Sequence, residues 1–208
     1  AAMSEVFLTQ RNLINVLRQV SGTGLMAVGM LFVILTRGID LSVGSVAALG
    51  SVGSALMVQQ MAPMASVGLT MLVGASVGLV SGALIAFLKL PSFVTTLAAM
   101  TIARGAALSA SNGQPIRMGK AGDAITYFGA GSFWGIPFPV WLMGTVFVLA
   151  GLILTYTRFG RMVKAIGSNA EAVRLSGIPV ARYEVSVYEI SGALAALAGV
   201  VSSSRTGI

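Results

Sequence analysis

The amino-acid sequence predicts an all-α fold, a polytopic transmembrane helix bundle with about six spans. Of its 208 residues, 56% are hydrophobic and only 9% are charged, whereas a soluble domain carries about 25% charged residues. Uncharged apolar intervals recur along the chain, and several reach the roughly 20 residues that a helix needs to cross a bilayer. We therefore expect lipid to be the principal solvent of a single transmembrane domain that covers residues 1–208.

The first half of the chain contains four of the expected spans. The first occupies residues 19–36, and the uncharged interval 41–88 is long enough for two more, separated by the polar turn QQMAP at 59–63. The fourth begins near Pro91, because proline suits the first turn of a helix. Its apolar run is interrupted by Arg104.

The second half contains a long polar loop, a fifth span, a charged segment and a sixth span. The loop at 112–137 is rich in glycine, proline and aromatic residues, which is typical of an extramembrane segment that ends in an interfacial aromatic belt. The fifth span occupies roughly 138–156, and the sixth begins near Val185. Residues 1–20 form an amphipathic lead-in rather than a signal peptide, and we expect the chain to be a fragment of a longer membrane domain.

Several kinds of chemistry are excluded by residue types that the chain lacks. It has no cysteine and no histidine, which removes the common thiolate and imidazole metal ligands, disulfides and the Ser/His and Cys/His nucleophile pairs. Its six acidic residues are scattered, and no phosphate-binding GxxxxGK[ST] loop is present. We therefore expect no catalytic site, metal or cofactor in this chain. The net charge of +7 is not organised as a nucleic-acid-binding patch.

The stretch TRGIDLSVGS at 36–45 places an arginine and an aspartate between two apolar stretches. Gly38 breaks the first helix, and both Asp40 and Ser42 are good N-cap types for the helix that follows. We expect the Asp40 carboxylate to accept hydrogen bonds from backbone N–H groups at the positive end of that helix. Two interpretations remain: an interfacial turn with an N-cap, or a discontinuous helix near 37–43 whose polar backbone groups line a substrate path.

Two further ionisable residues fall within expected spans. A charge at the bilayer centre costs roughly 2.5–3.5 kcal/mol on insertion scales, so it needs a partner or an escape to the interface. Arg104 is expected either to snorkel to the interface or to pair with a buried group such as Asp40. Glu189 is expected to be an interfacial carboxylate near Arg182.

The segment 158–184 is the most basic part of the chain, and we expect it on the cytoplasmic side of the membrane. Its pattern predicts a helix that stops at Gly167, followed by a short helix capped by Ser168 or Asn169 and ended by Gly177. Such a short helix fits either a pocket on a partner protein or a plain solvated loop. Alternation of the spans then places the long polar loop outside.

Five motifs follow one another along the chain. They are GIDLSVGS at 38–45, PSFVTTLAAMTIARG at 91–105, NGQPI at 112–116, FGRMVKAIGSNAEAVRLSGI at 159–178 and SGALAALAGV at 191–200. In this order and spacing, over nearly the whole chain, they resemble the permease subunits of ribose-type ABC sugar importers, in the branched-chain amino acid/ribose-type family of binding-protein-dependent permeases. The resemblance implies a roughly ten-span family fold in the bacterial inner membrane, of which this chain holds about six spans.

The same resemblance implies a function and a set of partners. The chain is expected to form the translocation pathway of an ATP-driven importer of ribose-type monosaccharides, as one of a pair of permease subunits that are most simply a homodimer. Cytoplasmic ATPase subunits below it would bind ATP and magnesium, and a periplasmic sugar-binding protein would dock above it. The chain itself is then not an enzyme, and it has membrane lipid but no nucleic acid as a partner.

Candidate site residues fall in two groups. The family signature lies beside the pathway, and with the intramembrane arginine it provides the pathway candidates Gly38, Asp40, Ser42, Gly44, Ser45 and Arg104. In the family, the region that matches 160–177 docks on the ATPase, which implies coupling roles for Gly160, Arg161, Ala165, Gly167, Glu171, Ala172 and Gly177. The sequence departs from the family at Arg37 and Glu189, where uncharged residues are common.

Two other functions remain as alternatives to an importer subunit. In an ion-coupled secondary transporter, Asp40, Arg104 and Glu189 would be the coupling residues, and a gradient would drive uptake without ATP. In a non-transporting membrane scaffold subunit, disruption of the short cytoplasmic helix would leave sugar uptake unchanged.

Overall fold

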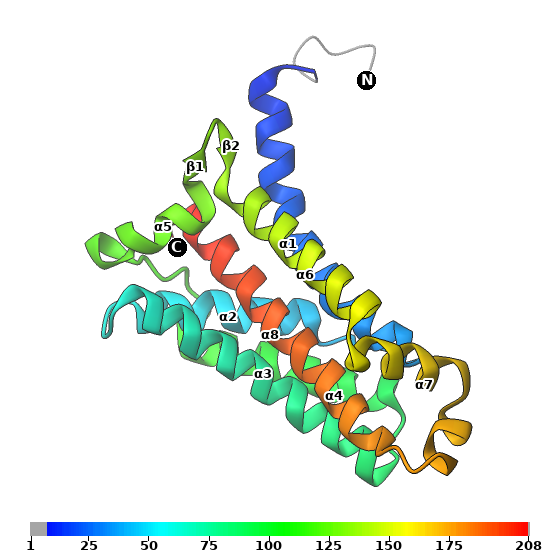
Figure 1. The fold of residues 1–208 in the computed structure, drawn as a ribbon. Helices are drawn as coiled ribbons and strands as arrows, with labels where there is room; N and C mark the ends of the chain where they lie inside the picture. The colour runs from blue at the N-terminus through cyan, green and yellow to red at the C-terminus, as the bar shows by residue number, and fades with distance from the viewer. Residues whose placement is uncertain (1–7, 208) are drawn as a thin grey trace.

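The computed structural model describes residues 8–207, except for the side chains of residues 120, 121 and 124, and it consists almost wholly of helices (Figure 1). Strands β1 (Ser132–Phe133) and β2 (Ile136–Pro137) form a small antiparallel hairpin. The helices are α1 (Gln10–Leu35), α2 (Val43–Met57), α3 (Pro63–Leu88), α4 (Ser92–Ser111), the 3-10 helix η1 (Gly119–Gly122), α5 (Asp123–Ala130), α6 (Phe138–Tyr156), α7 (Arg158–Leu175) and α8 (Val180–Thr206). The predicted all-α membrane bundle is confirmed.

Five of the described helices are long and apolar enough to cross a membrane: α1, α3, α4, α6 and α8. The remaining predicted span, the first of the two expected within residues 41–88, corresponds to α2, which is apolar but has only 15 residues. These residues extend over about 22 Å at the helical rise, less than the roughly 30 Å of a bilayer core. α2 therefore does not cross the bilayer by itself.

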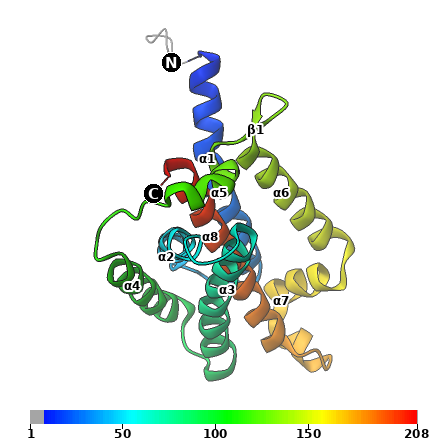
Figure 2. The same ribbon diagram turned by 90° about the vertical axis from the view of Figure 1, so that its left-hand side faces the viewer.

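α8 lies at the centre of the bundle, between α1, α2 and α3 (Figures 1 and 2). Most residues in its apolar stretch are buried, whereas few of those in α6 are. The glycines Gly74 and Gly78 of α3 meet the backbone of α8 at Gly192 and Tyr188, and Gly50 of α2 meets it at Ala196. Close backbone approach of this kind is how helices gain van der Waals contact in lipid. The small residues along α2, α3 and α8 therefore form packing seams.

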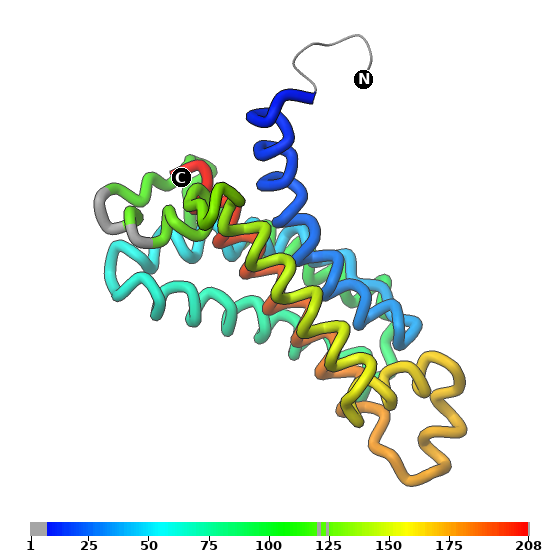
Figure 3. Tube along the Cα trace, turned by 45° about the horizontal axis from the view of Figure 1, so that its top comes forward, coloured from blue at the N-terminus to red at the C-terminus, as the bar shows by residue number. Residues whose placement is uncertain are grey.

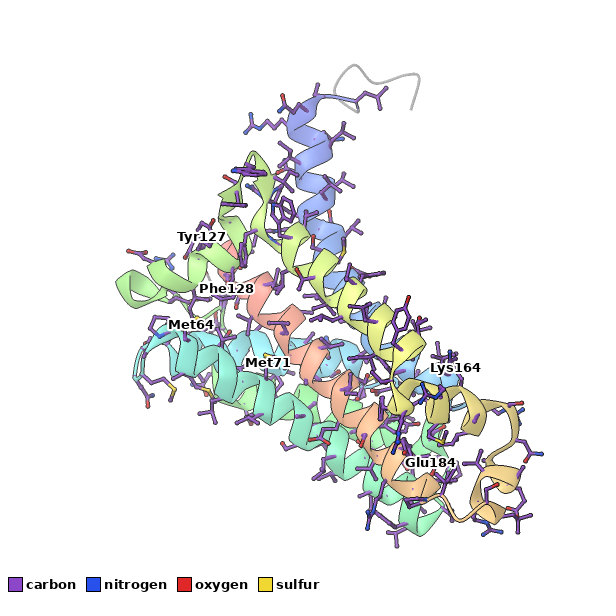
Figure 4. All side chains as sticks on the ribbon, viewed as in Figure 1. Met64, Met71, Tyr127, Phe128, Lys164 and Glu184 are labelled. Carbon is purple, nitrogen blue, oxygen red and sulfur yellow. The ribbon has the colours of Figure 1, made fainter. Side chains whose placement is uncertain are left out.

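The bundle has two distinct ends. α7 and the turn between α3 and α4 lie at one end, which we name the α7 end, whereas the start of α1, the hairpin and the end of α8 lie at the other (Figure 3). The α7 end carries charged side chains from different helices, among them Lys164 of α7 and Glu184 of α8 (Figure 4). The basic segment 158–184 lies at this end.

Two helix boundaries differ from the predictions. α8 begins at Val180 rather than near Val185, so Glu189 lies more than two turns inside the helix. The predicted polar loop at 112–137 contains α5, whose Ile125 is fully buried and packs in one hydrophobic cluster with Met118 and with residues of α8. Both the start of α8 and the presence of α5 depend on tertiary packing, which the local sequence pattern does not indicate.

Candidate functional site

The helix break predicted near 37–43 lies between Leu35, the last residue of α1, and Val43, the first of α2. α1 ends in a Schellman motif, in which the N–H of Gly38 donates to the carbonyl of Val33 (3.0 Å) and the N–H of Arg37 to that of Ile34 (2.9 Å). Residues 36–42, which we name the linker, then continue without helical structure to the N-cap of α2.

The linker reverses the direction of the chain. Gly29 of α1 packs against Ser191 of α8, and eleven residues later the side chain of Asp40 also reaches Ser191. Further along α2, Gly50 meets Ala196, so α2 runs parallel to α8 whereas α1 runs antiparallel to it. Because Ser191 lies near the middle of α8, the linker returns to the middle depth of the bundle. This position fits an interruption at membrane depth and does not fit an interfacial turn.

Asp40 is the centre of this break. Its side chain is buried, with 3% of its surface exposed, and its Oδ1 accepts hydrogen bonds from the N–H (3.0 Å) and the hydroxyl (2.6 Å) of Ser42. Its Oδ2 accepts a hydrogen bond from the hydroxyl of Ser191 (2.8 Å). The prediction that Asp40 accepts a backbone N–H is confirmed. Ser42 is the N-cap residue of α2, but its hydroxyl bonds to Asp40 and makes no cap hydrogen bond.

The backbone of the linker is satisfied by hydroxyl groups of two other helices. The carbonyl of Ile39 accepts from Thr96 of α4 (3.3 Å) and from Tyr188 of α8 (3.4 Å). Gly38 allows this approach, since a Cβ there would collide with the Tyr188 hydroxyl and lie 2.9 Å from Cγ1 of Val33. Non-helical backbone at membrane depth needs such partners. No local signal in the sequence indicates the hydroxyls of Thr96, Tyr188 and Ser191 as partners of the linker.

The remaining pathway candidates are spread over different surroundings. Ser45 is buried, whereas nothing lies within 4 Å of a Cβ built on Gly44. Gly44 borders a cavity of about 540 Å³ between α1, α2 and α8, which is also lined by Thr23 and Ser51. Gly44 and Ser45 thus lie in the first turn of α2, directly after the linker that holds Gly38, Asp40 and Ser42.

Of the two expectations for Arg104, the pairing with Asp40 is not observed. Arg104 is exposed on α4, and among the described residues the only ion pair is that of Glu171 with Arg174 (2.7 Å). The expected proximity of Glu189 to Arg182 likewise yields no ion pair in the described part of the chain. Asp40 is satisfied by hydroxyl and backbone donors, so it does not need a cationic partner.

α7 has the two-part form that the sequence predicts. Asn169 interrupts its helical backbone with φ −154° and ψ 93°, and its Oδ1 accepts from the N–H of Ala172 (3.0 Å), which makes it the cap of the second part. Gly177 follows the helix with φ 78°. The predicted cap at Asn169 and the stop at Gly177 are therefore confirmed, whereas the predicted stop at Gly167 is wrong, because Gly167 is helical and the interruption comes at Asn169.

The coupling candidates occupy both parts of α7. Gly160 packs against the backbone of α6 at Leu154, and Ala165 packs against the small buried cluster that joins α7 to the start of α8. In the second part, Glu171 and Ala172 are exposed, as is the large apolar side chain of Leu175. The exposed candidates are Arg161, Glu171, Ala172 and Gly177. The second part of α7 thus presents a mixed polar and apolar surface.

α7 also contacts the end of α1. Gly167 approaches the carbonyl of Leu35 so closely that a Cβ would collide with it. One residue later, the carbonyl of Ser168 accepts a hydrogen bond from the Arg37 guanidinium (2.8 Å). Arg37 and Ser168 are 131 residues apart, and no local signal in the sequence indicates this contact.

Residues 12–208 match the family described as "Branched-chain amino acid transport system / permease component". The chain belongs to this permease family. It is a permease component rather than an enzyme, and a multi-pass protein of the bacterial inner membrane. No solved structure matches the chain.

Curated relatives in this permease family are ribose and arabinose permeases. The chain is 41% identical over 208 residues to the ribose import permease protein RbsC of Escherichia coli K12, which covers 99% of the chain and 65% of the relative. It is 43% identical over 200 residues to RbsC of Bacillus subtilis 168, covering 96% and 62%. It is 38% identical over 203 residues to the L-arabinose ABC transporter permease protein AraH of Azospirillum brasilense, covering 97% and 59%. The chain spans less than two thirds of the length of each.

Proposed function

We propose that the chain is part of the transmembrane permease subunit of an ATP-driven importer for ribose-type monosaccharides. The observation that carries this proposal is the match to ribose and arabinose import permeases over nearly the whole chain. The geometry supports it, since a helix break at the middle depth of the bundle is joined directly to a kinked, exposed helix at the α7 end. The match favours an importer over an ion-coupled transporter or a scaffold subunit.

The proposal assigns partners to the two ends of the molecule. A second permease subunit, most simply an identical copy, completes the pathway, and cytoplasmic ATPase subunits dock on the second part of α7 and bind ATP and magnesium. A periplasmic sugar-binding protein docks on the opposite end, and lipid surrounds the apolar outer helices. No group of three or more potential metal ligands occurs among the described residues, and in this proposal the chain itself holds no cofactor.

The proposal also assigns roles to the site residues. The pathway residues are those at the break, with Asp40 fixing the linker to α8 so that α2 starts at a defined position. Arg104 is exposed on α4 and is not part of the helix break. In this proposal it is a separate pathway residue. The coupling residues lie on α7, where Gly160 and Gly167 fix its first part to α6 and α1, and Glu171 and Ala172 face the ATPase.

Reconstitution of the transport complex tests this function. The complete permease, its ATPase and its binding protein are placed in liposomes, and uptake of radiolabelled ribose, arabinose, xylose and galactose is measured. We expect uptake of at least one sugar only when ATP and the ATPase are present. Uptake by the permease alone in a sodium or proton gradient would instead support an ion-coupled transporter. Absence of any uptake with the complex intact would support a scaffold.

A further inference from the structure

Arg37 occupies a backbone conformation that an arginine does not favour. Its φ is 62°, at the C′ position of the Schellman motif that ends α1. Glycine is the usual residue there, because the Cβ of any other L-residue strains the left-handed backbone. The helix end itself would therefore be better served by glycine. The contribution of Arg37 must come from its side chain.

That side chain reaches the kink of α7. The Arg37 guanidinium donates to the carbonyl of Ser168 at 2.8 Å, and Ser168 immediately precedes the non-helical Asn169. The carbonyl thus belongs to the C-terminal end of the first part of α7, where the helix dipole favours a cation. Gly167 lies against the carbonyl of Leu35 beside it. Two adjacent contacts therefore hold the kink of α7 on the last residues of α1.

On its other side, Arg37 adjoins the fixed part of the linker. Three residues later, the buried Asp40 is held by Ser191 of α8 and by Ser42 at the start of α2. Ile39 is held by Thr96 and Tyr188. Only a few residues therefore separate the α7 kink, which Arg37 contacts, from the start of α2. That chain has little slack, because hydrogen bonds fix both of its ends.

We propose that Arg37 is a positioning residue that couples α7 to the helix break, because its bond to the Ser168 carbonyl transmits movement of α7 to the linker that carries Asp40. This inference rests on the proposed function, in which the ATPase moves α7. Arg37 touches neither sugar nor ATPase in this role and acts only through the linker.

The test measures coupling in the complete reconstituted complex, with sugar uptake and ATP hydrolysis recorded in the same vesicles. For Arg37→Gly we expect uptake per ATP hydrolysed to fall at least about fivefold, the lower end of common coupling effects. The thermal unfolding midpoint should be unchanged or higher, because glycine removes the backbone strain, and the ATPase should still co-purify. Arg37→Lys, which keeps a cationic donor, should retain most of the coupling.

Lys89 provides a matched control. It is also a cation in the left-handed region at a helix end, with φ 56° after α3. Lys89→Gly removes the same strain and the same charge without touching the Arg37 contact, so it should leave uptake per ATP unchanged. Wild-type uptake per ATP in Arg37→Gly would overturn the proposal. So would a loss of uptake accompanied by a lower unfolding midpoint, which indicates a structural role alone.

A second measurement does not depend on transport. Because this chain has no cysteine, spin labels are attached at Ile34→Cys and Leu175→Cys, two exposed positions on α1 and α7. Electron–electron distance measurements in nanodiscs should show a broader distribution in Arg37→Gly than in the Arg37 protein. An unchanged distance distribution would contradict the proposal that Arg37 holds the α7 kink against α1. If wild-type complexes show no ATP-driven uptake, the proposed function fails, and this measurement still decides the role of Arg37 at the kink.

Discussion

At the scale of single residues, the hydrogen bonds of Asp40 decide where α2 begins. The carboxylate takes three donors from Ser42 and Ser191, and hydrogen bonding of this kind compensates for burial of a charge. The bond to Ser191 fixes the break to the central helix, and the bonds to Ser42 fix it to the start of the next helix. One side chain therefore joins three segments of the chain.

Replacement of Asp40 by alanine should destabilise the fold measurably. The change leaves a buried N–H and two buried hydroxyls without their acceptor, and each unsatisfied group costs about 1–3 kcal/mol. We expect a lower thermal unfolding midpoint of the purified protein in detergent and a smaller decrease for Ser191→Ala. Ser186→Ala is the control, because that hydroxyl bonds only to the carbonyl of Arg182 in its own helix. A midpoint for Asp40→Ala equal to that of the control would contradict this account.

Two glycines of the break should respond differently to alanine. A methyl group at Gly38 collides with the Tyr188 hydroxyl, whereas one at Gly44 meets nothing within 4 Å. Gly38→Ala should therefore displace Tyr188 and lower the unfolding midpoint, with a cost of about 1–3 kcal/mol as for other overpacked sites. Gly44→Ala should fold normally. Equal midpoints in size-exclusion-monitored heating would show that the linker does not approach Tyr188 as described.

Residue-level predictions from the sequence succeed where the partners are neighbours. The bond between Asp40 and the N–H of Ser42 follows from side-chain type and spacing, since aspartate readily caps nearby backbone groups. No such signal connects Arg104 with Asp40, because residues far apart in sequence give no indication of which helix faces they occupy. The contact of Arg37 with Ser168 is undetectable in the sequence for the same reason.

At the scale of elements, α7 was the most predictable helix in its internal structure. Its cap at Asn169 and its stop at Gly177 depend on local backbone preferences. α2 was less predictable, because an uncharged interval does not reveal that the chain returns to middle depth before its helix starts. The start of α8 and the presence of α5 depend on burial of Val180 and Ile125 against other elements.

Reversal of the charge of Glu171 on α7 should weaken docking of the ATPase without destabilising the fold. Glu171 and Arg174 form an exposed ion pair, and such pairs stabilise a fold by about 0–1 kcal/mol. Glu171→Arg should therefore leave the unfolding midpoint almost unchanged and reduce co-purification of the ATPase and sugar uptake. Glu171→Gln removes the charge without reversing it and should have the weaker effect. Full co-purification and full uptake in Glu171→Arg would remove this residue from the docking surface.

At the scale of the whole molecule, the bundle has an orientation that labelling can measure. Leu175 at the α7 end is 78% exposed and Trp134 in the hairpin at the other end is 85% exposed. The absence of cysteine makes single-cysteine variants straightforward to interpret. In intact cells, a membrane-impermeant maleimide should label Trp134→Cys, whereas Leu175→Cys should react only after the membrane is opened. The reverse pattern would place α7 outside and exclude ATPase docking on it.

The central position of α8 has a consequence for how this protein can change in evolution. On three sides the helix meets its neighbours through glycine, alanine and serine, with backbones close enough that an added methyl group collides at Gly192 and Gly199. A residue on this helix can therefore be replaced by a larger one only if a facing residue is replaced by a smaller one in the same lineage. The outer surface of α6 carries no such restriction. Sequence drift should accumulate at the periphery, while paired, compensating replacements should mark the centre.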